Sequence, residues 1–484
     1  MRRMPFSLLL IFLLFICIGY VSTLALSNDH SNTMRLELIH RHAPQLMGKV
    51  FGGRPKTQLQ RIKELLHSDS IRQHMISHKR RLSLSQRRKA WETPRSNCSS
   101  SSSSSIEMAI GSGAYHGAGQ YFVALKVGTP AQKFMVIADT GSDLTWMNCE
   151  YRCGQDCSKK KRLKHRRVFH ADGSSSFRTV PCLSEMCKIE LMNLFSLTSC
   201  PTPLTPCAYD YRYADGSAAL GFFANETISL GLSNGRKTKL DDVLIGCSES
   251  VQGQSVQAAD GVLGLGFSKY SFAFKAAAKF GGKFSYCLVD HLSPKNVSNY
   301  LTFGSHINTA ASPNDMQFTK LLLGVISPLY AVNVMGISSG GVMLDIPFEV
   351  WDINGVGGTV FDSGTSLTYL TVPAYQPVMA ALEASLLRFG KLKLDIKPLN
   401  YCFNSTGFDE SLVPRLAFHF ADGARFEPPV KSYVIDAAPG VKCVGFVSTS
   451  WPGTSVIGNI MQQNNLWEFD LVQNKLGFAP STCT

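Results

Sequence analysis

From residue 120 to the end, the chain consists of short apolar runs separated by Gly, Asn and Asp. Residues 120–130 predict a strand that ends in a Gly-Thr-Pro turn, and residues 133–138 predict a second strand. Runs rich in β-branched and aromatic residues favour strands, and residues such as Gly and Asn favour the turns between them. Helical patterns are few, at Phe272–Ala278 and Ala374–Phe389. The pattern therefore predicts a mainly β body whose strands are mostly antiparallel.

One longer apolar stretch, residues 321–337, is interrupted by Pro328 and Asn333. Spanning a bilayer takes about 20 apolar residues in one helix, so this stretch is better explained as a pair of buried strands. At the other end, basic residues precede an apolar run from Leu8 to Val21 and a group of small residues. Residues 1–26 are typical of a secretory signal peptide. The alternative, an uncleaved membrane anchor, is disfavoured because the apolar run is short.

Residues 27–112 alternate basic and apolar positions and contain seven consecutive serines at 99–105. Between residues 28 and 110, fifteen Lys and Arg stand against six Asp and Glu. We interpret this region as a basic propeptide with a Ser-rich linker, and a plain disordered spacer is the alternative. Its positive charge can pair with carboxylates of the body at neutral pH, and acid would weaken that pairing.

The net charge of +13 suggests a nucleic-acid binder until the charge is located. Most of the excess lies in the leader, and residues 159–167 carry a further seven Lys and Arg without an aromatic residue. Nucleic-acid surfaces commonly interleave aromatic residues with basic ones. A solvated loop is the better interpretation of this basic run, and a contact with an anionic cell wall is a weaker one.

The most informative pattern is a repeat. The first copy reads Val-Ile-Ala-Asp139-Thr140-Gly141-Ser142, and the second reads Thr-Val-Phe-Asp362-Ser363-Gly364-Thr365-Ser366. Two carboxylates facing each other cannot both ionise easily, so they share a proton and can act as an acid and a base on water. Residues 260–267 and 454–461 are also alike, and each segment follows its Asp by about a hundred residues. The duplication predicts two lobes, residues 113–308 and 309–484, with a cleft between them.

The chain has 14 cysteines, which indicates an oxidising compartment. Cys17 leaves with the signal peptide and Cys98 lies in the leader, so twelve remain and six disulfides are expected. The spacing of Cys149, Cys153 and Cys157 does not fit a zinc knuckle, and we expect no metal and no cofactor.

Together these motifs strongly resemble the pepsin-like aspartic proteases, and in particular the secreted plant branch that includes the nepenthesins. The resemblance covers residues 118–484. It is carried by Ala138–Trp146, Tyr213–Ser217, Phe361–Ser366 and Val456–Asn459, and by the closing Trp467–Asp470 and Leu476–Pro480. It implies a bilobal, mainly β pepsin-like fold with pseudo-twofold symmetry.

The resemblance also implies a role for each residue of the motifs. Asp139 and Asp362 hold the nucleophilic water. Thr140 and Ser363 cross-link the two loops, Gly141 and Gly364 present backbone N–H groups, and Ser142 and Thr365 bond the outer carboxylate oxygens. Tyr213, Asp215 and Gly216 form a flap over the substrate, and Trp146 bonds the flap tyrosine.

The resemblance further implies the pairing of the twelve cysteines. The implied pairs are Cys149–Cys153, Cys157–Cys247, Cys182–Cys207, Cys187–Cys200, Cys287–Cys483 and Cys402–Cys443. Sequons for N-glycosylation occur at Asn225, Asn296 and Asn404 of the body and at Asn97 of the leader.

The sequence thus predicts a secreted plant aspartic endopeptidase, made as a zymogen and active in acid. The expected partners are a peptide or protein substrate and the chain's own propeptide, which acts as an intramolecular inhibitor. We expect a monomer without nucleic-acid or membrane partners after signal cleavage, located in the apoplast or a vacuole. The alternative is a catalytically silent relative that inhibits or binds another protein.

Overall fold

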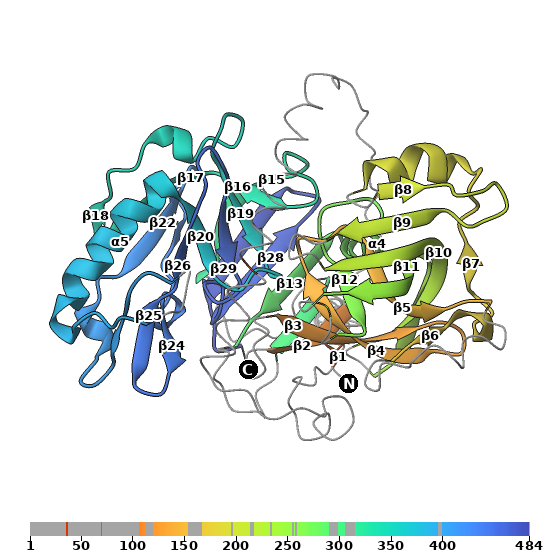
Figure 1. Ribbon diagram of the computed structural model, residues 1–484, viewed down its shortest axis with the longest axis horizontal. Helices are drawn as coiled ribbons and strands as arrows, with labels where there is room; N and C mark the ends of the chain where they lie inside the picture. Colours follow the sequence, from red (N-terminus) through yellow and green to blue (C-terminus); the bar gives the residue numbers. More distant parts are fainter. Residues whose placement is uncertain are drawn as a thin grey trace, which may run out of the picture.

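Two lobes lie side by side in the computed structural model, with a central sheet between them (Figure 1). The structure describes residues 35–36, 69, 106–112, 120–152, 167–194, 197–212, 217–232, 235–253, 256, 259–289, 299–304, 315–394 and 399–483. Both predicted helices are present in this part of the chain, as α4 (Phe272–Lys279) and α5 (Val372–Leu386). Neither these nor any other helix described is long and apolar enough to cross a membrane.

The first lobe is built from strands that precede α4. They are β3 (Tyr121–Val127), β4 (Gln132–Asp139), β5 (Thr145–Glu150), β6 (Phe169–His170), β7 (Arg178–Thr179), β8 (Leu197–Ser199), β9 (Ala208–Arg212), β10 (Ala218–Gly231), β11 (Lys237–Gln252) and β12 (Gly261–Gly264). β3 and β4 are the two strands predicted from the apolar runs, and they pair antiparallel. The short helical turns of this lobe are η3 (Ala171–Gly173), η4 (Met186–Glu190) and η5 (Leu191–Asn193).

The second lobe contains one sheet beside the central sheet and two smaller sheets outside it. Its strands are β16 (Tyr330–Val332), β17 (Val334–Ser339), β18 (Val342–Met343), β19 (Thr359–Asp362), β20 (Thr368–Thr371), β21 (Cys402–Asn404), β22 (Leu416–Phe420), β23 (Arg425–Phe426), β24 (Val434–Ala438), β25 (Val441–Val444), β26 (Phe446–Thr449) and β27 (Ser455–Gly458). Its short helical turns are η7 (Phe348–Val350), η8 (Leu387–Phe389), η9 (Glu410–Leu412) and η10 (Val430–Ser432).

The central sheet draws its strands from both halves of the chain. In spatial order they are β1 (Arg35–Leu36), β2 (Ile106–Ser112), β14 (Asn299–Phe303), β13 (Lys283–Cys287), β28 (Asn465–Asp470), β29 (Lys475–Pro480) and β15 (Gln317–Leu322). The apolar stretch 321–337 therefore contributes to three strands, β15 to β17, rather than to a pair.

Residues 106–112, which the sequence assigned to the leader, form β2. β2 pairs with β14 and also with β3 of the first lobe. This strand supplies backbone hydrogen-bonding partners that the edge of β14 needs. The end of the leader, expected at residue 112, therefore falls within the sheet that joins the lobes.

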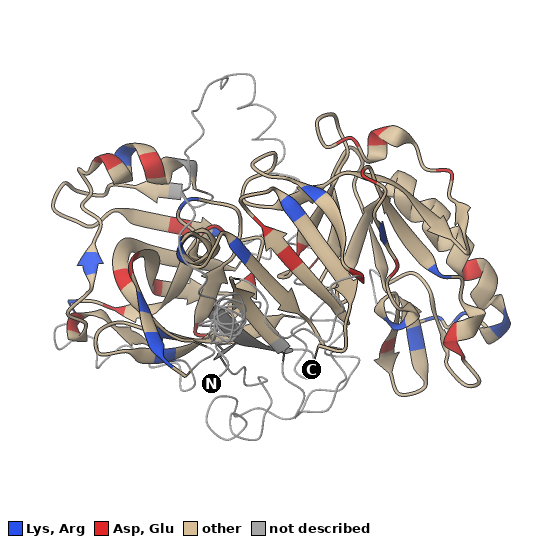
Figure 2. Cartoon of the chain, turned by 180° about the vertical axis from the view of Figure 1, so that it is seen from behind, with Lys and Arg blue, Asp and Glu red and all other residues tan. Residues whose placement is uncertain are grey.

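A continuous hydrophobic core runs through the central sheet into both lobes. The rings of Phe284 and Phe469 stack with 4.7 Å between centroids, and Tyr330 packs against Phe469 at 4.8 Å. Tyr330, on β16 of the second lobe, also donates its hydroxyl at 2.7 Å to Leu265 O, which directly follows β12 of the first lobe. In the described part of the chain, Lys and Arg as well as Asp and Glu are scattered over both lobes (Figure 2).

The disulfides agree only partly with the pairs implied by the resemblance. Cys287–Cys483 and Cys402–Cys443 are paired as expected. Cys149 pairs with Cys247 instead of Cys153: the two residues lie on the neighbouring parallel strands β5 and β11, with a Cα separation of 5.0 Å. The pairing expected for Cys157 with Cys247 is therefore wrong, and Cys153 and Cys157 themselves lie outside the described residues.

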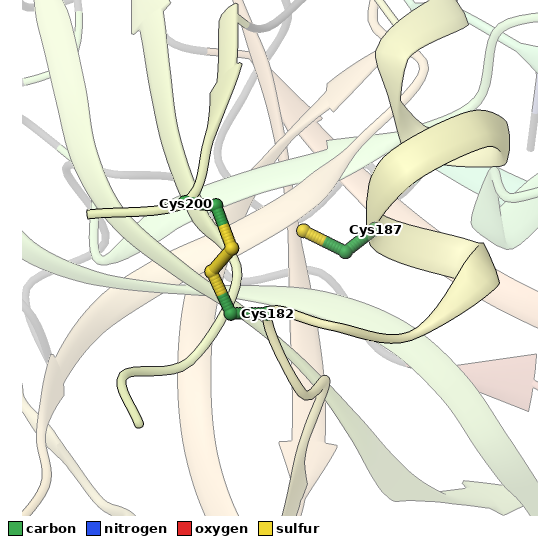
Figure 3. A group of neighbouring side chains, drawn as sticks. All are labelled: Cys182, Cys187 and Cys200. Carbon is green, nitrogen blue, oxygen red and sulfur yellow. A yellow bond between two sulfur atoms is a disulfide. The ribbon is translucent and has the colours of Figure 1, made fainter. Parts of the chain in front are cut away.

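The remaining four cysteines of the first lobe exchange partners relative to the expectation. The pairs are Cys182–Cys200 and Cys187–Cys207 rather than Cys182–Cys207 and Cys187–Cys200. The side chain of Cys187 points toward the Cys182–Cys200 disulfide (Figure 3). The sulfur atoms of Cys182, Cys187 and Cys200 all lie within 4.8 Å of one another, so spacing along the chain did not determine which of them are bonded.

Candidate active site

Each repeated Asp stands at the end of a strand that is flanked by a parallel neighbour. β4 delivers Asp139 beside Gly264 of β12, and β19 delivers Asp362 beside Gly458 of β27. The two similar segments noted in the sequence, residues 260–267 and 454–461, thus contain the parallel partners of the Asp strands. The repeat in sequence corresponds to a repeat in backbone pairing.

A glycine is required at both neighbouring positions, because the chain crosses closely there. A Cβ at Gly458 would lie 2.1 Å from Leu367 O, and a Cβ at Gly264 would lie 2.8 Å from the carbonyl carbon of Leu144. These distances are shorter than van der Waals contact, so a side chain would displace the loop that follows each Asp. Gly264 and Gly458 let each Asp loop pack directly on its parallel strand.

The two carboxylates have matching hydrogen-bond donors. Gly141 N donates to Asp139 Oδ1 at 2.8 Å, and Gly364 N donates to Asp362 Oδ1 at 3.0 Å. The second oxygen of each carboxylate accepts a hydroxyl, from Ser142 on Asp139 and from Thr365 on Asp362, the latter at 2.6 Å. Donors of this kind favour and orient the ionised form of a carboxylate.

The two loops are also bonded to each other. Thr140 N donates to Ser363 Oγ at 3.0 Å, and Ser363 N donates to Thr140 Oγ1 at 2.8 Å. Ser363 Oγ in turn donates to Ala138 O at 3.0 Å. These bonds link residues 223 positions apart in the chain, and they match the hydroxyl-to-backbone cross-link implied by the resemblance. They hold the residues that follow Asp139 and Asp362 against each other.

The site is enclosed by protein. Asp139 is 1% exposed and Asp362 is fully buried. Tyr286, on β13, interacts with the charge of Asp362. Burial raises the pKa of the Tyr286 phenol, and the negative charge of Asp362 raises it further. Tyr286 therefore stays protonated, and it donates its hydroxyl to the side chain of Gln462.

The predicted flap can be located only in part. Tyr213, Asp215 and Gly216 lie outside the described residues. Trp146, on β5, is completely buried in a hydrophobic cluster with Tyr211, and β9 ends just before the segment predicted to be the flap while β10 begins just after it.

Three polar residues at or near the site were not assigned roles from the sequence. Asp143, one residue beyond Ser142, accepts the hydroxyl of Tyr211 at 3.3 Å, and Asn459 Nδ2 donates to Ser363 O at 2.9 Å. Asp143 lies within the motif Ala138–Trp146 and Asn459 within Val456–Asn459, so both residues could have been found from the motifs that carry the resemblance. The third, Asp69, lies in the region that the sequence predicts to be a leader; it accepts a hydrogen bond from the loop after Asp362, and no pattern along the chain indicated it.

Two of the three body sequons can be placed. Asn404 is exposed, and its side-chain oxygen accepts from the backbone and hydroxyl of Thr406. Asn225 is partly buried in the middle of β10, where strands pair on both sides. Asn296 lies outside the described residues. Of the two placed sequons, Asn404 is the accessible one.

One group of potential metal ligands occurs in the described part of the chain, formed by Cys182, Cys187 and Cys200. Disulfides occupy all three of these sulfur atoms. The cluster is therefore part of the disulfide framework, and it does not offer free thiolates to a cation.

Comparison with known proteins agrees with this geometry. Residues 121–305 match a family model described as xylanase inhibitor N-terminal, and residues 329–480 match one described as xylanase inhibitor C-terminal. The chain is 34% identical over 377 residues to aspartyl protease family protein 2 of Arabidopsis thaliana, which covers 77% of this chain and 73% of that protein. It is 33% identical over 377 residues to aspartic proteinase nepenthesin-1 of Nepenthes gracilis, which covers 76% of this chain and 79% of that protein.

Among solved structures, basic 7S globulin from soybean superimposes with a TM-score of 0.61 at 21% identity, covering 78% of this chain and 97% of the globulin chain. The fold and the paired Asp loops define a bilobal pepsin-like protein. The chain belongs to the family of plant pepsin-like aspartic proteases.

Proposed function

We propose that this protein is a secreted aspartic endopeptidase whose catalytic pair is Asp139 and Asp362. One observation carries the proposal: two carboxylates with equivalent donors stand on loops that are bonded reciprocally through Thr140 and Ser363. Relatives named as aspartic proteinases support the same activity.

In the proposed reaction, the two carboxyl groups share one proton and hold a water molecule between them. The ionised group takes a proton from the water as its oxygen attacks the carbonyl carbon of the peptide, and the protonated group gives its proton to the carbonyl oxygen. When the tetrahedral intermediate collapses, the C–N bond breaks and the nitrogen takes up a proton. The products are an amine and a carboxylic acid.

The active form of the pair carries one shared proton. Loss of that proton at higher pH stops catalysis, and uptake of a second proton stops it only at low pH, so the mechanism favours acid conditions. The apolar N-terminal run, the basic leader and the buried disulfides support secretion as a zymogen. The flap role of Tyr213, Asp215 and Gly216 is part of the same proposal, as is glycosylation at Asn404.

The test is peptide cleavage by purified protein between pH 2 and 7. We expect Asp139→Asn and Asp362→Asn each to lower kcat by about 10²- to 10⁴-fold, because each removes a group that transfers a proton. Asp345→Asn is the matched control, since Asp345 is an exposed carboxylate in the second lobe. Its kcat should stay at the wild-type value.

Retention of wild-type cleavage by both catalytic variants would reject the proposed function. A folded wild type that cleaves no peptide at any pH would also count against the proposed function and would favour the alternative, a catalytically silent relative.

A further inference from the structure

A carboxylate from the leader is buried in the second lobe. Ser366 N donates to Asp69 Oδ1 at 2.9 Å, and Leu367 N donates to Asp69 Oδ2 at 2.7 Å. Asp69 is 1% exposed, and it lies 297 positions before Ser366 in the chain. Each carboxylate oxygen thus accepts one of two consecutive backbone N–H groups.

These two amides belong to the loop that carries Asp362. Thr365, which precedes them, donates its hydroxyl to Asp362. The carbonyls of Thr365 and Ser366 accept from Asn459 N at 2.7 Å and Ile460 N at 3.0 Å. The carbonyls of this segment are thus bonded within the body, and its amides are bonded to the leader.

We propose that the amides of Ser366 and Leu367 form a carboxylate-binding site that fastens the leader to the loop of Asp362, with Asp69 as its ligand. The inference deepens the proposed function, on which it rests, because it assigns the point where the leader of the zymogen is attached. It also changes the expected sign of the charge that the leader contributes to its contact with the body. The sequence suggested basic leader residues on acidic body residues, whereas this contact joins an acidic leader residue to neutral backbone donors.

The chemistry makes the site sensitive to acid. An ionised carboxylate accepts hydrogen bonds about twice as strongly as a neutral acceptor. Protonation converts one of its oxygens into a donor, which cannot accept the N–H group in the same way. The phenol of Tyr369 on β20 also faces this charge: burial raises the pKa of Tyr369, and Asp69 raises it further. Tyr369 therefore stays neutral as Asp69 is titrated.

A second backbone contact ties the leader to the body. Strand β1 of the leader pairs in parallel with β2, with Arg35 opposite Glu107. β1 lies on the central sheet and Asp69 lies on the second lobe, so loss of one contact need not detach the other. A variant at position 69 therefore tests the carboxylate site separately from the strand pairing.

The experiment is hydrogen–deuterium exchange on the full-length zymogen, kept at neutral pH. We expect Asp69→Asn to speed exchange of the amides of Ser366 and Leu367 at least about tenfold, since bonds to a charged acceptor are worth roughly that factor or more. Asp69→Glu, which keeps the carboxylate, should restore part of the protection. Glu64→Gln is the matched control, because it removes one negative charge from the same leader. Exchange in β13 reports whether the body stays folded.

Two further readings complete the test. After correction for intrinsic exchange, protection of these amides should fall on acidification in the wild type and stay constant in Asp69→Asn. Peptide cleavage without acid pre-treatment should rise in Asp69→Asn alone. Equal exchange in the wild type and Asp69→Asn overturns the proposal, and so does an equal change in Glu64→Gln. If exchange changes as expected but no variant cleaves peptide, the proposed function fails and the carboxylate site stands.

Discussion

Thr140 and Ser363 each form hydrogen bonds to the other through both the backbone N–H group and the side-chain hydroxyl. Each hydroxyl oxygen accepts the other residue's N–H group, and both residues are buried. A buried N–H without a partner costs about 1–3 kcal/mol, so neither hydroxyl can be lost without leaving the opposite loop unsatisfied. At the scale of single residues, the hydroxyls therefore couple two loops that carry different carboxylates.

Replacing Thr140 by Val tests this coupling, since the two side chains have nearly the same shape. We expect unfolding free energy to fall by about 1–3 kcal/mol and kcat to fall with it, because Ser363 N loses its acceptor. Denaturant unfolding and peptide cleavage measure the two effects. Thr238→Val, on a partly exposed position of β11, should change neither. A stable and fully active Thr140→Val protein would show that the loops hold their geometry without the cross-link.

At the scale of elements, the features that could be predicted from the sequence are the ones carried by a repeated motif or by local periodicity. Asp139 and Asp362 and their hydroxyl neighbours could be identified because the second copy of the motif made chance improbable. The strands β3 and β4 and the helices α4 and α5 followed from local periodicity.

Features that depend on contacts across the chain could not be predicted in this way. The partners of Cys149 and Cys182 depend on which strands become neighbours, and spacing along the chain does not contain that information. The same is true of β2, whose assignment to the central sheet depends on the edge of β14. Asp69 looked like one acidic residue in a basic leader, and only the fold places it at Ser366 and Leu367.

The parallel pairing of β19 and β27 gives a prediction for Gly458. We expect Gly458→Ala to destabilise the protein by about 1–3 kcal/mol or more, because its Cβ would meet Leu367 O at 2.1 Å. It should also lower kcat, since the displaced loop carries Asp362. Gly173→Ala is the control, as a Cβ there meets nothing within 4 Å. Thermal unfolding and cleavage assays on both variants measure the difference, and equal behaviour would refute the close-packing argument.

At the scale of the whole molecule, the two lobes share one sheet and one core. β13 and β14 follow the strands of the first lobe along the chain, while β28 and β29 follow the strands of the second lobe. Phe284 and Phe469 stack across this junction. The lobes are therefore not two independent domains joined by a linker, and a defect in the junction should weaken both.

Phe469→Ala tests this unity. Truncating a buried Phe costs about 3–5 kcal/mol, and we expect that loss to lower the unfolding transition of both lobes together. Unfolding followed by fluorescence and by hydrogen exchange in β10 and α5 measures each lobe separately. Phe348→Ala is the control, because Phe348 is 60% exposed. Unfolding of one lobe alone in Phe469→Ala would contradict a shared core.

The central sheet also sets the order of events during synthesis. β13 can pair with β28 only after residues up to Asp470 have been made, and Cys287 can bond Cys483 later still. At about 5–20 residues per second, the 196 positions between these cysteines take roughly 10–40 s to translate. For that interval the first lobe waits with β13 unpaired on the side that β28 will occupy. A stop codon that removes β28 and β29 should therefore disable the first lobe as well as the second.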